Sequence, residues 1–127
     1  MSLARRVGIN LAYKIIYFPL ILFLLPQLFL DHVVYSSWVV PFTLSALYIA
    51  IGLIADETVL PKFGLVSSTI QGCVFMIVVT WLSQFVFNGT VISIFAAIVI
   101  GLLLGIGEYL MHQRILAWRR TEMLSSP

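Results

Sequence analysis

Three long runs without a charged residue constrain this chain more than any other feature of its sequence. They extend from Ile15 to Leu30, from His32 to Ala55 and from Phe63 to Gly107. A helix needs about 20 apolar residues to cross a hydrocarbon core of about 30 Å. The second run suits one such helix, and the third suits two, divided at the turn signal Asn88-Gly89-Thr90. The first run is short for a span. It becomes long enough if the helix also includes residues 10–13 and Lys14 extends its side chain to the lipid headgroups.

The composition shows which environments the chain can occupy. Of its 127 residues, 61% are hydrophobic and 9% are charged. Soluble domains average about 45–50% apolar residues and about 25% charged residues. Seven Lys and Arg with five Asp and Glu cannot cover a soluble domain of this size with polar groups. The composition therefore excludes a soluble globular protein, a disordered tail and a nucleic-acid-binding protein. The expected partner of the surface is the lipid bilayer.

We therefore expect an all-α fold, an integral membrane bundle of four transmembrane helices in a single domain over residues 1–127. The helices are expected at about residues 9–30, 35–55, 65–87 and 91–111, followed by a cytoplasmic tail at 112–127. Helices and closed barrels are the structures that satisfy every backbone hydrogen bond in lipid. A barrel strand alternates polar and apolar residues, and these runs do not.

The basic residues predict how the bundle is oriented. They lie near the N-terminus, between the second and third expected helices, or near the C-terminus: Arg5, Arg6, Lys14, Lys62, Arg114, Arg119 and Arg120. The opposite side carries Asp31, His32 and the Asn88 turn. Since Lys and Arg are enriched in cytoplasmic segments, we expect a multi-pass protein of the cytoplasmic membrane with both termini inside. A cleaved signal peptide is disfavoured, because no small-x-small site follows Leu30.

Small residues predict where helices pack closely. Ala97, Gly101 and Gly105 are spaced four apart, so they form one stripe on the last helix. In lipid, such stripes allow close approach of two backbones. Contact within one bundle is the favoured interpretation. Contact with a second copy or another membrane protein remains the alternative.

Five polar residues lie at one expected membrane depth, near the cytoplasmic ends of helices two and four. They are Asp56, Glu57, Lys62, Glu108 and His112. Ionisable groups in or beside a membrane are candidates for function. Three interpretations stay open: a structural cluster of ion pairs, a site for proton or ion coupling, and a metal site. A helical metal site usually repeats its ligand motif on several helices, so we expect no metal, no cofactor and no catalytic residue.

Three segments carry a resemblance to a known family. Residues 54–64 read Ile-Ala-Asp-Glu-Thr-Val-Leu-Pro-Lys-Phe-Gly, residues 68–70 read Ser-Thr-Ile, and residues 107–112 read Gly-Glu-Tyr-Leu-Met-His. The chain resembles the small bacterial four-helix membrane proteins of domain-of-unknown-function family 2512 (YndM-like). In that family an acidic residue closes helix two, Leu-Pro-Arg/Lys-Phe-Gly follows, and Glu-x-x-x-His lies near the end of helix four.

The resemblance implies that Asp56, the loop turn from Pro61 to Gly64, Glu108 and His112 form one constellation. Pro61 would stiffen the loop, and Gly64 would allow a sharp entry into helix three. The sequence departs from the family pattern at Leu65, where the family has Asn. It departs again at Gln71-Gly72, where the family has an acidic residue.

The family that the chain resembles has no established activity. The expected function is therefore inferred only from the arrangement of the helices and the polar residues. We expect a non-enzymatic integral membrane protein with a structural or interaction role. The alternative is an oligomeric small transporter or channel subunit that uses the cytoplasmic-side Asp/Glu/His cluster. A membrane metalloenzyme ranks third.

Overall fold

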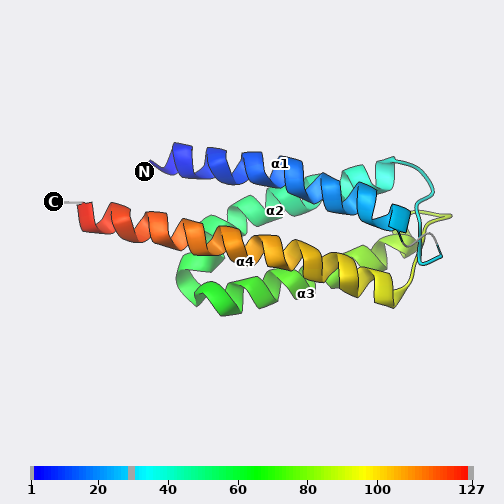
Figure 1. The fold of residues 1–127 in the computed structure, drawn as a ribbon. Helices are drawn as coiled ribbons and strands as arrows, with labels where there is room; N and C mark the ends of the chain where they lie inside the picture. Colours follow the sequence, from blue (N-terminus) through cyan, green and yellow to red (C-terminus); the bar gives the residue numbers. More distant parts are fainter. Residues whose placement is uncertain (1, 29–30, 126–127) are drawn as a thin grey trace.

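The described residues form four helices, which make up the body of the molecule, and two short strands, which close one end of it. The computed structural model describes residues 2–28 and 31–125 (Figure 1). The elements, in chain order, are α1 (Leu3–Leu28), β1 (Val33–Val34), α2 (Val39–Phe63), α3 (Leu65–Val86), β2 (Val91–Ile92) and α4 (Ile94–Ser125). The start of α1, the end of α4 and the turn between α2 and α3 lie at the same end of the bundle.

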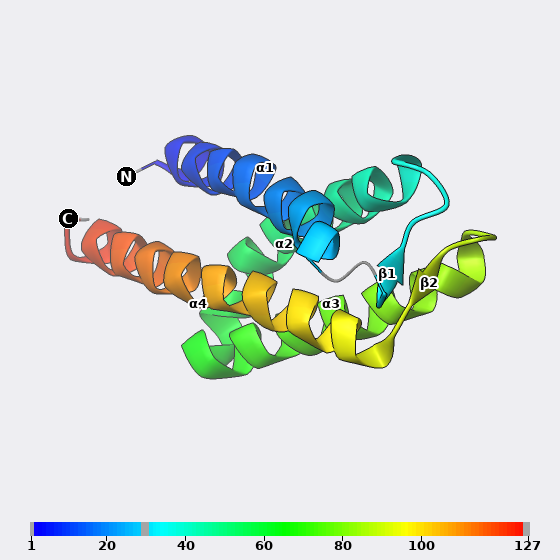
Figure 2. The same cartoon turned by 45° about the vertical axis from the view of Figure 1, so that its right-hand side comes forward.

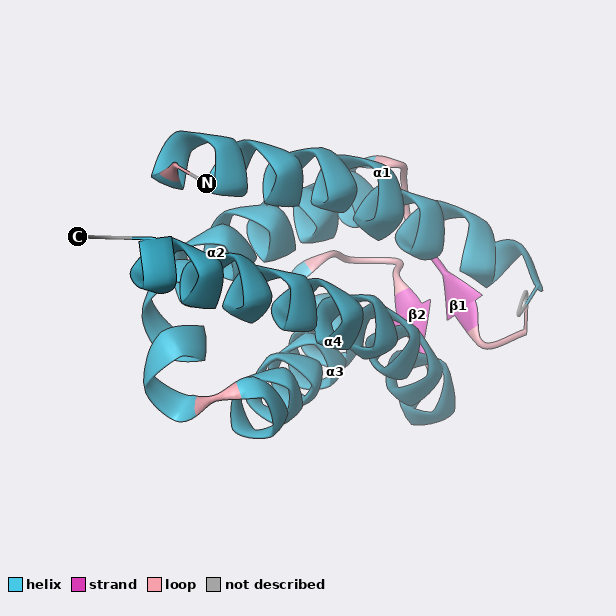
Figure 3. Ribbon diagram, turned by 60° about the vertical axis from the view of Figure 1, so that its left-hand side comes forward, coloured by secondary structure: helices cyan, strands magenta, loops and turns pink. Residues whose placement is uncertain are grey.

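The helices have the character expected of membrane spans. All four are long and apolar enough to cross a membrane. At 1.5 Å per residue, the 26 residues of α1 extend about 39 Å, more than the thickness of a hydrocarbon core. Large apolar side chains such as Leu20, Ile54 and Leu102 are exposed on the outside. The all-α fold with four such helices is therefore confirmed, and helices make up nearly all of the described chain (Figure 3).

Three helices are longer than expected or shifted along the chain. The first begins at Leu3 rather than residue 9, the second covers 39–63 rather than 35–55, and the fourth covers 94–125 rather than 91–111. The expected tail at 112–127 is thus helical as far as Ser125, and the expected helix end at residues 29–30 lies outside the described residues. The charged residues mark the edge of an apolar run, whereas backbone hydrogen bonding continues past that edge.

The connection between α2 and α3 is shorter than the loop expected at Pro61 to Gly64. Pro61 lies inside the last turns of α2, and Gly64 alone separates the two helices. Gly64 has φ of 85°, a backbone conformation that favours glycine, and its N–H donates to the carbonyl oxygen of Leu60 at 2.9 Å. Leu60 is fully buried, so the last turns of α2 still pack against the rest of the bundle.

The opposite end of the bundle is held by the two strands. Val33 pairs with Ile92 and Val34 with Val91 in an antiparallel ladder (Figure 2). The turn signal at residues 88–90 lies just before β2, and Gly89 there has φ of 88°. The hydroxyl oxygen of Thr90 accepts the backbone N–H of Ser36 at 3.0 Å. This pairing ties the α1–α2 connection to the α3–α4 connection.

The small-residue stripe of α4 lies against α3 of the same chain. A Cβ atom added to Gly101 would collide with the side chain of Ile77 and lie 3.2 Å from its Cα atom. At Gly105 an added Cβ would lie 3.0 Å from the Sγ atom of Cys73. These glycines therefore let the two backbones approach within a distance that larger residues prevent.

Candidate functional site: a buried ionic network

Lys14 of α1 is the centre of an ionic network inside the bundle. Its side chain has no exposed surface, and its Nζ atom lies 3.0 Å from Oδ2 of Asp56 on α2. The same ammonium group also contacts Oε1 of Glu108 on α4. One cation thus pairs with carboxylates from two other helices. The expectation that Lys14 reaches the headgroups is wrong, because two buried carboxylates lie within its reach.

His112 joins the two carboxylates from the other side. Its Nε2 atom lies 2.9 Å from Oδ1 of Asp56 and 3.0 Å from Oε2 of Glu108. Its Nδ1 atom lies 2.8 Å from the hydroxyl oxygen of Thr69 on α3. Glu108 and His112 are four residues apart and therefore share one face of α4. Through these contacts the network reaches all four helices.

Asn10 of α1 extends the network by one helical turn. Its Nδ2 group donates to Oδ2 of Asp56 at 2.8 Å. Its Oδ1 atom is buried and has no hydrogen-bond partner among the described residues, and the same is true of the Tyr13 hydroxyl group. A buried acceptor without a partner is unfavourable, so this part of the network has capacity for one further donor.

A second ionic cluster lies closer to the helix ends. Arg6 of α1 contacts Oε1 of Glu57 at 2.7 Å and Oε2 of Glu122 at 2.7 Å. Arg119 contacts Oε1 of Glu57 at 3.2 Å. The clusters are offset along α1 because Arg6 and Lys14 are eight residues apart, about 12 Å at 1.5 Å per residue.

The structure separates the five polar residues that the sequence grouped together. Asp56, Glu108 and His112 meet in the buried network, and Glu57 belongs to the outer cluster. Lys62 is in neither cluster: it is exposed, and its Nζ atom lies 5.5 Å from the ring centroid of Phe63. Lys62 follows Asp56 by six residues, which turns it about 120° away around a helix of 3.6 residues per turn.

Sequence reasoning missed the contribution of α1. Arg6, Asn10 and Lys14 are buried and spaced four apart, continuing into Phe18 and Leu22 on the same face. A helix that faced lipid all round would not align its polar residues in this way. That periodicity was the signal in the sequence that α1 turns a polar face towards other helices.

Asp56, Glu108 and His112 carry donor atoms of the kinds that metal ions bind. One ligand atom from each residue can be chosen so that all three lie within 4.8 Å of one another. Two carboxylates and an imidazole suit several divalent ions. Lys14, however, already pairs with both carboxylates, so a divalent ion held by these three residues would leave the site with a net positive charge. The geometry favours a network of ion pairs over a metal centre.

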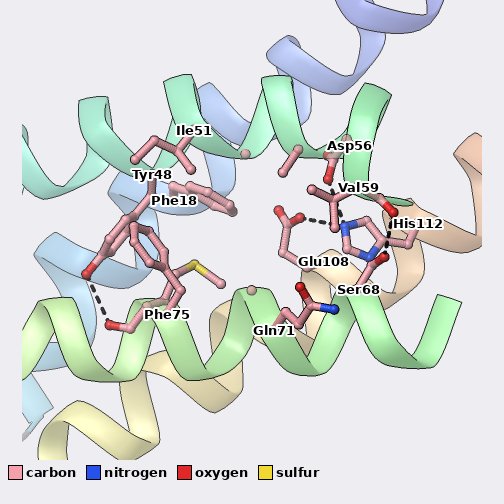
Figure 4. Close-up of a pocket in the computed structure, with 14 residues that line it drawn as sticks. Phe18, Tyr48, Ile51, Asp56, Val59, Ser68, Gln71, Phe75, Glu108 and His112 are labelled. Carbon is pink, nitrogen blue, oxygen red and sulfur yellow. Dashed lines mark hydrogen bonds and ion pairs between the residues drawn. The ribbon is translucent and has the colours of Figure 1, made fainter. Parts of the chain in front are cut away.

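A cavity of about 160 Å³ lies beside the network, between α2 and α3. Figure 4 shows its two unlike ends. Asp56, Glu108 and His112 lie at one end, and aromatic side chains, among them Phe18 and Tyr48, lie at the other. The Tyr48 hydroxyl group hydrogen-bonds to the Thr80 hydroxyl group at 2.6 Å, so it is held at the far end of the cavity.

Fold and site together define a four-helix bundle with the length and apolar character of membrane spans and an ionisable interior. Comparison with known families agrees with the resemblance in the motifs. The family described as "Protein of unknown function (DUF2512)" matches residues 6–123, and the chain belongs to it. Comparisons with curated proteins and with solved structures found no match.

Proposed function

We propose that the chain is a non-enzymatic, multi-pass protein of the bacterial cytoplasmic membrane whose buried network holds the helices in one arrangement for a structural or interaction role. The observation that carries this proposal is Lys14, fully buried between Asp56 and Glu108. In lipid the hydrophobic effect does not drive helices together, so packing and polar contacts select the arrangement. A charged side chain at the centre of a membrane helix costs about 2.5–3.5 kcal/mol, and this cost disfavours arrangements that separate the three residues.

The proposed orientation places both termini in the cytoplasm. In support of this, the exposed basic residues Arg5, Lys62, Arg114 and Arg120 belong to the helix ends on the side of the α2–α3 turn and both termini. The opposite end, with the two strands, carries Asp31 and His32 instead. Cytoplasmic segments are enriched in Lys and Arg, and exposed basic residues there also contact anionic headgroups.

Cysteine labelling tests membrane insertion and orientation together. In a Cys73→Ala background, an impermeant maleimide applied to intact spheroplasts should label Asn88→Cys. Met123→Cys should react after the membrane is permeabilised. Both Asn88 and Met123 are exposed, so both positions are accessible in the folded chain. The reverse pattern would contradict the orientation, and recovery of the chain in the soluble fraction would contradict membrane insertion.

A second candidate function is a small transporter subunit, and the cavity beside the titratable network favours it. A single chain has no continuous path through the described bundle, since Leu22, Leu44, Ile100 and Leu104 fill the core beyond the cavity and are at most 2% exposed. Transport would therefore require an oligomer or a rearrangement of the helices.

Proteoliposomes separate the two candidates. Transport predicts that an imposed pH gradient decays faster with the protein than in protein-free liposomes, and that Glu108→Gln slows this decay. Lys62→Gln is the matched control, because Lys62 is exposed and outside the network. Decay equal to that of protein-free liposomes would exclude proton transport without a second substrate and leave the structural role in place.

A further inference from the structure

The cavity has the size of a binding site for a small organic molecule. Its volume is about 160 Å³, and an engineered cavity of about 150 Å³ in another protein binds benzene. Gly72 of α3 lines it, and a Cβ atom added to Gly72 would meet nothing within 4 Å among the described residues. The space is therefore open on the α3 side, where a side chain could otherwise have filled it.

The lining of the cavity selects for an apolar molecule with a positive charge. Phe18, Tyr48 and Phe75 provide aromatic rings at one end. These rings provide a large apolar surface against which the apolar part of a ligand can pack. The other end carries the carboxylates of Asp56 and Glu108. An anion would meet both carboxylates without a free basic partner, because Lys14 already contacts each of them.

The charges of the network do not balance when His112 is neutral. Lys14 contributes one positive charge from α1, whereas Asp56 of α2 and Glu108 of α4 contribute two negative charges, a net charge of −1. On α3 the neutral Thr69 hydroxyl group faces His112, and Tyr13 of α1 lies beside Lys14. An uncompensated charge in a low-dielectric interior is costly. One bound proton or one bound monovalent cation restores neutrality.

The contacts of His112 suit both protonation states. Its Nε2 atom faces one oxygen of Asp56 and one of Glu108, so an N–H group there can donate to either carboxylate. Its Nδ1 atom faces the Thr69 hydroxyl group. That hydroxyl group can accept from a protonated Nδ1 or donate to an unprotonated one. The site can therefore gain or lose a proton without losing a hydrogen bond.

We propose that the cavity binds a small lipophilic monocation in exchange for the proton of the network. The cation places its apolar part against the aromatic end and its charge near Asp56 and Glu108, and one proton leaves His112 for the solvent. This inference goes beyond the structural role and names a ligand class for the transport candidate. Binding without flux would remove the transport candidate and leave the inference standing.

Titration calorimetry of the full-length protein in neutral detergent tests the exchange. Phenyltrimethylammonium is the probe, because its charge does not change with pH. Between about pH 6 and about pH 7 the dissociation constant should fall by up to about tenfold, as expected for one linked proton. Two buffers with different ionisation enthalpies should report release of about one proton per cation. No binding, or binding without proton release, would overturn the proposal.

Two variants and one neutral compound locate the effect. Gly72→Leu should weaken cation binding at least about tenfold, because the leucine side chain would occupy the space that the cation needs. Gly8→Leu is the matched control, since Gly8 is exposed on α1 and also has open space around it. The same affinity in Gly72→Leu and the unmodified protein would place the cation outside the cavity and overturn the proposal. tert-Butylbenzene, which has the same shape without the charge, should release no proton.

His112→Gln tests which group exchanges the proton. In this variant the dissociation constant should not depend on pH over the same range, and no proton should be released. An unchanged pH dependence would contradict the assignment to His112. If this variant fails to fold, Gly72→Leu still tests the site, because that substitution leaves every charged residue in place.

Discussion

Lys14→Met should lower the free energy of unfolding in detergent by about 3–5 kcal/mol, the range for removing one partner of a buried ion pair. The substitution keeps an unbranched side chain of similar length but leaves Asp56 and Glu108 buried together without their shared cation. Two carboxylates that both contact His112 would then repel each other. Thermal unfolding followed by intrinsic fluorescence, together with the yield of monodisperse protein, measures the effect.

Lys62→Met is the matched control for this prediction. It makes the same chemical change at an exposed lysine outside both ionic clusters, so stability should change by less than about 0.5 kcal/mol. Adding Glu108→Gln to Lys14→Met should recover part of the loss, because one uncompensated carboxylate is removed. Equal stabilities of Lys14→Met and Lys62→Met would contradict the role proposed for the network.

Gly101→Leu should lower the free energy of unfolding by about 1–3 kcal/mol through overpacking. Even a Cβ atom at this position collides with Ile77 and approaches its backbone, so α3 and α4 must move apart along their contact. Chemical denaturation in mixed micelles measures the change in stability. The loss should exceed that of Lys62→Met clearly.

Gly72→Leu serves as the control for the same substitution at another helical glycine. An added Cβ atom there meets no described atom within 4 Å, and the cavity offers about 160 Å³ for the rest of the side chain. Its stability should stay the same or rise, because leucine favours a helix more than glycine does. A larger loss at Gly72 than at Gly101 would contradict the packing described for α3 and α4.

Several features followed from local sequence patterns. The uncharged runs predicted four apolar helices, and the described part of the chain forms four. The motifs around Asp56 and around Glu108 indicated the family that the comparison shows. Spacing by four placed Glu108 and His112 on one face, and the two do contact each other. Each of these inferences depends on residues close together in the chain, where helix geometry alone relates them.

Helix bounds were predicted less well, for a reason visible at Pro61. A break in the apolar run together with a proline predicts a loop, whereas α2 continues to Phe63 and the chain turns at Gly64 alone. The end of a helix depends on backbone hydrogen bonds and on burial of residues such as Leu60. Hydropathy reports neither quantity.

The role of α1 depended on contacts far apart in the chain. A lysine near the start of an apolar run can extend to the headgroups or pair inside the bundle, and its own neighbours in sequence suit both. Lys14 pairs with Asp56 and Glu108, which are 42 and 94 residues away. The energy of a charge in lipid depends on such partners. The amino-acid sequence therefore predicted an apolar exterior suited to a membrane, the number of helices and the polar residue types. The packing of the four helices established which charges meet and where the cavity remains open.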